Sequence, residues 1–149
     1  MLKKILVLVC IILNLSLTVL ADYKPIPKQF KHQYKKEVEQ TIKLEIPKLK
    51  RQIDNIEIEL NNETNLVIKQ TILDKGITSI LFEFYSSLVD TTNKYIKIKN
   101  DIPSTDWYIE LKEFINPYLI DNKISNRQIN SFLNYAEKKQ KYLEKKYSN

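Results

Sequence analysis

The side chains that most often carry out catalysis are scarce in this sequence. Among its 149 residues there are one histidine and one cysteine, His32 and Cys10. A Ser-His-Asp triad or a Cys-His pair would have to use His32, and a zinc site needs several Cys or His ligands. The single glycine also excludes the glycine-rich loops that bind nucleotides. The sequence therefore predicts no metal site and no cofactor, with His32 as an exposed surface residue.

Pairs of carboxylates are the remaining candidates for acid–base chemistry. General acid–base catalysis needs two carboxyl groups that face one cleft and differ in pKa. Helices routinely carry such pairs on their solvent-exposed faces, so we expect no catalytic residue. Hydrolysis of a cell-wall polymer by a carboxylate pair is the alternative. The pairs close in sequence are Glu37 with Glu39, Glu57 with Glu59, and Glu110 with Glu113.

Two groups of residues are candidates for binding a partner. Aromatic side chains cluster around Pro117, and tyrosines alternate with lysines near the C-terminus. Tyr and Trp are common in protein interfaces, and lysines attract anions. The alternatives are core packing for the aromatic residues and a solvated helix face for the lysines. The candidate partner surface comprises Trp107, Tyr108, Tyr118, Lys138, Lys139, Lys145 and Lys146.

The class of partner follows from the charge and from the types of basic residue. The formal net charge of the chain is +6. Proteins that recognise nucleic-acid bases through hydrogen bonds use arginine most often. This sequence contains only two arginines, Arg51 and Arg127. We therefore expect an unknown protein or an anionic polymer as the partner, and no nucleic acid.

The N-terminus has the organisation of a secretory signal peptide. Lys3 and Lys4 precede an apolar run over residues 5–20, and Ala21 precedes Asp22. The small side chain of Ala21 fits the position before a signal-peptidase cleavage site, so we predict cleavage between Ala21 and Asp22. The apolar run of 16 residues is shorter than the roughly 20 that span a bilayer. An uncleaved anchor that tethers the protein to the membrane is the alternative.

A cleaved signal peptide indicates an exported protein that is either periplasmic or extracellular. Removing the signal peptide, 1–21, leaves 128 residues without cysteine, so burial alone must hold the fold together. This length fits a single helical domain over 22–149. Pro25 and Pro27 disfavour a helix at its start, so residues 22–29 are expected to form an extended leader.

Helical periodicity dominates the first half of the predicted domain. Apolar residues recur every three or four positions from Phe30 to Leu60, which predicts one amphipathic stripe. The stripe keeps its phase across Pro47, so we favour one helix that kinks there over two separate helices. Residues 54–60 also alternate with a period of two, so a strand is the alternative for them.

Gly76 is expected to end a helix, because glycine readily takes the left-handed conformation found at many helix C-termini. Residues 77–99 form the most apolar segment and predict a central helix. A buried strand over 77–84 is the alternative, since β-branched residues are common there.

The C-terminal third predicts a turn at 101–106 followed by two helices. Pro117 is expected to end or kink the first. Ser125 and Gln128 fit a capping box at the start of the second, which becomes polar beyond Ala136 and is expected to project or fray. The residues expected to face inward from the first are Trp107, Leu111, Phe114 and Ile115.

These segments together predict an all-α fold, an irregular bundle of four to five helices behind an N-terminal signal peptide. The function expected from them is that of an exported, non-enzymatic protein that binds a partner. An inhibitor or immunity protein against a secreted enzyme is one concrete form of this function.

Overall fold

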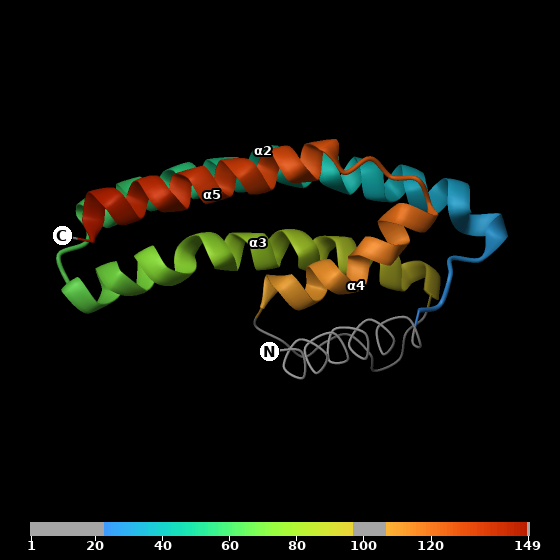
Figure 1. The fold of residues 1–149 in the computed structure, drawn as a ribbon, viewed down its shortest axis with the longest axis horizontal. Coiled ribbons are helices and arrows are strands. Elements are labelled where there is room, and N and C mark those ends of the chain that lie inside the picture. The colour runs from blue at the N-terminus through green and yellow to red at the C-terminus, as the bar shows by residue number, and fades with distance from the viewer. Residues whose placement is uncertain (1–22, 97–106, 149) are drawn as a thin grey trace, which may run out of the picture.

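The computed structural model describes residues 23–96 and 107–148, and these are overwhelmingly helical (Figure 1). The all-α prediction is confirmed, and this part of the chain contains no strand. The predicted signal peptide, its cleavage site at Ala21 and Asp22, and the predicted turn at 101–106 lie outside the described residues. The four α-helices are α2 (Lys31–Asn62), α3 (Leu66–Ile96), α4 (Tyr108–Asp121) and α5 (Arg127–Tyr147), with a short 3-10 helix, η1 (Lys28–Phe30), before α2.

Helix α2 runs without a break through Pro47, as the phase of the apolar stripe predicts. Pro47 is exposed, so the carbonyl of Lys43 that loses its helical partner can be hydrated. Residues 54–60 belong to the same helix, and the strand alternative for them is wrong. The buried stripe consists of Tyr34, Val38, Ile42, Leu49, Ile53, Ile56 and Leu60.

Helix α3 continues through Gly76, so the prediction that this glycine ends a helix is wrong. Its φ is not positive, and a Cβ added to it would lie 3.1 Å from Cδ1 of Ile56 on α2. The absence of a side chain at Gly76 therefore serves the close approach of α3 to α2. The strand alternative for 77–84 is also wrong, since these residues are helical.

Helices α2 and α3 form a long antiparallel hairpin, and α4 and α5 pack against different halves of it (Figure 1). Tyr108, at the start of α4, stacks on Tyr85 in the middle of α3 with 6.1 Å between ring centroids. At the other end of α4, Asp121 accepts a 3.0 Å hydrogen bond from Lys31. Helix α5 instead extends to the hairpin tip, where Tyr147 donates to Asn61. The α4 layer therefore covers only the half of α3 that is farther from the tip.

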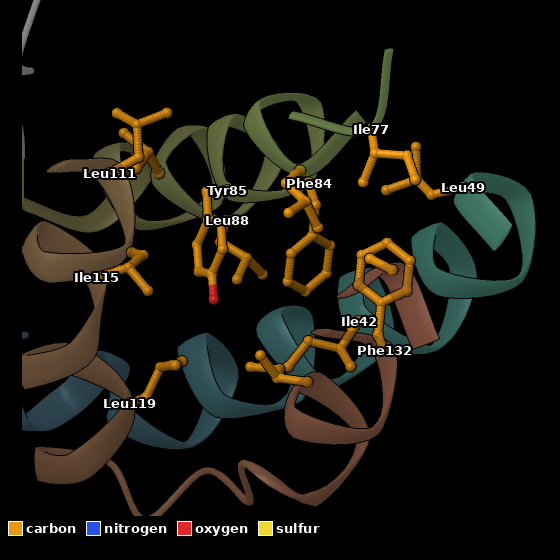
Figure 2. Packing of buried hydrophobic residues seen from close by; sticks show 14 of the residues in the cluster. Ile42, Leu49, Ile77, Phe84, Tyr85, Leu88, Leu111, Ile115, Leu119 and Phe132 are labelled. Atoms are coloured by element: carbon orange, nitrogen blue, oxygen red, sulfur yellow. The ribbon is translucent and has the colours of Figure 1, made fainter. Parts of the chain in front are cut away.

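The core lies where all four helices meet (Figure 2). Phe84 of α3 packs edge-on against Phe132 of α5, with 5.3 Å between ring centroids. Leu111 and Ile115 point into the same interior from α4, as the periodicity predicts. Trp107 does not, because 63% of its surface is exposed, so the inward placement expected for it is wrong.

The helix ends match the sequence expectations only in part. Helix α5 begins at Arg127 after Asn126, which makes no side-chain cap, so it starts one residue later than the predicted capping box implies. Of that box, the Ser125 contact is present, because Ser125 Oγ accepts a 3.3 Å hydrogen bond from the amide of Arg127. A left-handed residue ends α4 instead, namely Lys123 with φ of 53°. The amide of Lys123 donates to the carbonyl of Ile120, and that of Ile124 donates to Leu119. These two hydrogen bonds form a Schellman motif, which ends α4 with a left-handed residue of the kind that the sequence predicts at Gly76.

No described helix is long and apolar enough to cross a membrane.

Candidate binding surfaces

Tyr118 belongs to the core, so the prediction that it contributes to an exposed partner surface is wrong. Only 1% of its surface is exposed. Its ring packs against Tyr23 and Phe114, with centroid distances of 4.8 and 5.6 Å. Pro117 lies inside α4 rather than ending it, and this keeps Tyr118 on the buried face of the helix.

Lys139 and Lys146 are held by one carboxylate of α2. Each ammonium group lies 2.8 Å from a carboxylate oxygen of Glu57, and the Tyr142 hydroxyl donates to Glu57 at 2.8 Å. Hydrogen bonds from Lys139, Lys146 and Tyr142 lower the pKa of Glu57 from 4.5 to about 2. These two lysines therefore attach α5 to α2. Lys145 is exposed and forms no ion pair within the described residues.

The end of α5 packs against the hairpin, so the prediction that it projects or frays is wrong. Leu143 is 1% exposed, and the Tyr147 hydroxyl donates to Asn61 at 2.5 Å. The Tyr135 hydroxyl also donates to Asp54. Sequence reasoning missed these contacts because their partners on α2 lie more than 80 positions away.

A groove opens where the start of α4 meets α3, and one part of it extends to α5. It consists of two adjoining hollows of about 520 and 610 Å³ that share Thr78 and Tyr108. We call it the aromatic groove, since Trp107, Tyr108 and Phe82 line one end and Leu133 lies near the other. Of the predicted surface residues, Trp107 and Tyr108, which are adjacent in the sequence, line this groove.

The rim of the aromatic groove carries balanced charge. Glu137 and Lys141 pair with each other at 2.6 Å, and Glu144 accepts a hydrogen bond from Gln140. An apolar floor with both signs of charge on its rim is typical of a protein-binding surface rather than of a site for a small charged ligand. The rim residues are Asp74, Lys75, Lys112, Glu137, Lys141 and Glu144.

A second groove lies between α2 and α5, and its charge is of one sign. Two hollows of about 240 and 550 Å³ share Lys50, Arg127 and Ser131. Among the described residues, no carboxylate lines either hollow. We call it the basic groove; its cations are Lys43, Lys50, Arg127 and Lys138.

Only Lys138 of the basic groove was among the sequence candidates. The spacing of two other groove cations could have been noticed in the sequence. Lys43 and Lys50 are seven residues apart, which places them on one helix face. Nothing in the sequence pairs that face with α5. Arg127 could only be added once the packing of α5 beside α2 was known.

The carboxylate pairs do not form an acid–base site. Glu59, Glu110 and Glu113 are exposed, while Glu57 is bound by cations. The hydrogen bond from Tyr95 is the main cause that lowers the pKa of Glu37. A general acid needs the opposite shift. The described residues contain no cluster of three His, Cys, Asp or Glu that could hold a metal ion.

No protein-family model, curated protein or solved structure matches this chain.

Proposed function

We propose that this is an exported, non-enzymatic protein that binds a partner protein through the aromatic groove. The observation that carries the proposal is the position at which α4 begins. Tyr108 lies beside the middle of α3, so the layer that α4 forms on the hairpin covers one half and stops. Beyond that point no described helix covers the strip between α3 and α5.

The partner segment that fits this strip is an amphipathic helix. Such a helix would continue the α4 layer toward the hairpin tip and place its apolar face on Leu81 and Leu133. Trp107 and Phe82 would flank one end of it. Aromatic residues next to an apolar floor are the usual anchors of protein interfaces.

The alternative of a wall-polymer hydrolase has no comparable support. Glu137 and Glu144 do line the aromatic groove, but they lie two turns apart on the same helix and both are exposed. Pairing with Lys141 lowers the pKa of Glu137, which disfavours it as a proton donor. A carboxylate pair with opposed pKa shifts would have supported hydrolysis.

Export through the predicted signal peptide completes the proposal. Cleavage after Ala21 would release the protein into the periplasm or the extracellular space. An inhibitor or immunity protein against a secreted enzyme is the form that we favour, because such proteins act by covering a partner and need no chemistry of their own. A retained N-terminal anchor would change the location and leave the binding face unaltered.

Site-directed photo-crosslinking in the natural producing cells tests the proposal. A photoreactive benzoylphenylalanine is placed at Thr78, which lines both hollows of the aromatic groove. The control position is Gln40, which is exposed on α2 and lines neither groove. We expect one protein to be captured from position 78 and not from position 40. Equal capture from both positions, or capture from position 40 alone, would contradict the proposal.

A further inference from the structure

We propose that the basic groove between α2 and α5 is a second binding site, whose ligand is a linear polyanion of phosphate groups. This inference is independent of the aromatic groove, since the two grooves share no lining residue. It rests on the number, spacing and availability of the cations.

The cations form two rows. Helix α5 lies beside the second half of α2 and runs in the same direction, as the contacts of Tyr135 with Asp54 and of Tyr147 with Asn61 show. At about 1.5 Å per residue, Lys43 and Lys50 are roughly 10 Å apart along α2, and Arg127 and Lys138 roughly 16 Å apart along α5. One phosphate cannot reach four cations over that length. A chain of phosphates lying along the groove can.

These cations are not neutralised within the described part of the chain. None of the four forms an ion pair there, whereas Lys139 and Lys146, further along α5, are bound to Glu57. The Tyr135 hydroxyl donates to Asp54, and the Lys139 ammonium group lies 3.9 Å from the same carboxylate, so Asp54 is already engaged by these two residues. The Lys50 ammonium group lies 5.1 Å from the Tyr135 ring centroid, which fixes one cation at the groove wall.

The other lining side chains favour phosphate esters over nucleic-acid bases. Asn130, Ser131 and Asn134 provide neutral hydrogen-bond donors beside the cations. Among the described residues that line this groove, Tyr135 is the only aromatic one, and the Lys50 ammonium group lies over one face of its ring. Binding of a strand through its bases relies on several rings on which successive bases stack, whereas a phosphate backbone needs only charge and donors. A concave groove also suits a chain better than the plane of lipid head groups.

Binding of medium-chain inorganic polyphosphate to the purified protein tests the inference. The groove variant is Lys50→Gln with Arg127→Gln. The control, Lys36→Gln with Lys145→Gln, also removes one exposed charge from α2 and one from α5, but outside the groove. We expect the groove variant to bind at least about tenfold more weakly at constant salt, and the control to stay within about twofold of wild type.

A second double variant of the groove, Lys43→Gln with Lys138→Gln, tests the inference independently if the first double variant misfolds. It should lose affinity for polyphosphate in the same way. Thr78→Arg, in the aromatic groove, should not weaken polyphosphate binding, so failure of one proposal is distinguishable from failure of the other. Equal losses in the groove and control variants would overturn the inference, since net charge alone would then explain binding. Tighter binding of orthophosphate, single-stranded DNA or phosphatidylglycerol vesicles than of polyphosphate would overturn the ligand class.

Discussion

At the scale of single residues, Glu57, near the tip end of α2, joins the hairpin to the last turns of α5. Its carboxylate accepts hydrogen bonds from Lys139, Tyr142 and Lys146, which span two helical turns. The pKa of Glu57 is therefore lowered to about 2. A carboxylate with a lowered pKa stabilises the folded protein above its unfolded pKa, and this contribution disappears as the pH falls through the folded value.

We predict that the Glu57 contribution to stability is lost between about pH 5 and pH 2. Glu57→Gln should lower the thermal midpoint at pH 7 and show a smaller further fall over this range than wild type. Glu59→Gln is the matched control, since Glu59 is exposed and its side chain makes no ion pair in the described residues. Thermal unfolding of wild type and of each variant at a series of pH values measures the midpoint at pH 7 and its fall at lower pH. An unchanged pH dependence in Glu57→Gln would show that the contacts are not maintained in solution.

Gly76 allows a second prediction at this scale. Replacing a glycine inside a helix with alanine stabilises it by about 0.5–1 kcal/mol, but the new Cβ would lie 3.1 Å from Cδ1 of Ile56. Gly76→Ala alone should therefore change the free energy of unfolding by less than about 1 kcal/mol. In an Ile56→Val background, which removes that carbon, the same substitution should stabilise by about 0.5–1 kcal/mol. Chemical denaturation of the four proteins measures the coupling, and identical effects in both backgrounds would refute the close-approach explanation.

At the scale of elements, the sequence predicts where the helices lie better than where they end or what they touch. The apolar stripe from Tyr34 to Leu60 is confirmed, because a period of 3.6 depends only on local spacing. The role of Gly76 and the packing of Lys139 and Lys146 could not be predicted. Each depends on a partner residue in another helix, which no local pattern specifies.

The C-terminal turns of α5 are part of the packed structure, and stability should reflect this. Leu143 is 1% exposed, so Leu143→Ala should cost about 2–5 kcal/mol of unfolding free energy. Lys145→Ala, two residues away and exposed, should change it by less than about 0.5 kcal/mol. Urea unfolding separates the two cases. A Leu143→Ala variant as stable as wild type would mean that these turns are frayed, as sequence polarity alone suggests.

The C-terminus of α4 offers a stabilising change. Lys123 adopts φ of 53°, a conformation that costs a residue with a side chain about 1–2 kcal/mol. Because glycine avoids that cost but loses more entropy on folding, Lys123→Gly should stabilise the protein by up to about 1 kcal/mol. Lys36→Gly, at an exposed position inside α2, should destabilise it by about that amount. If both substitutions destabilise in urea unfolding, the left-handed cap is not formed.

At the scale of the whole molecule, the unequal lengths of the helices create the aromatic groove. The hairpin helices have 32 and 31 residues, whereas α4 has 14 and α5 has 21. Because α4 is short, part of α3 is left uncovered by described helices, and the aromatic groove lies there, whereas the basic groove follows the seam between α2 and α5. Trp107 and Tyr108, which are adjacent in the sequence, both line the aromatic groove, whereas the fold separates the C-terminal lysines that the sequence groups together. Only Lys138 of that group lines the basic groove.

The central claim is that the aromatic groove binds a partner protein. The most direct test uses the partner that cross-linking identifies, purified on its own, and measures its affinity for this protein. Calorimetric titration would compare wild type with Thr78→Arg, which adds a long charged side chain to both hollows without altering a core residue. Gln40→Arg adds the same charge on α2, away from both grooves. We predict a loss of at least about tenfold for Thr78→Arg and a change within about twofold for Gln40→Arg. Equal affinity for all three proteins would contradict the claim.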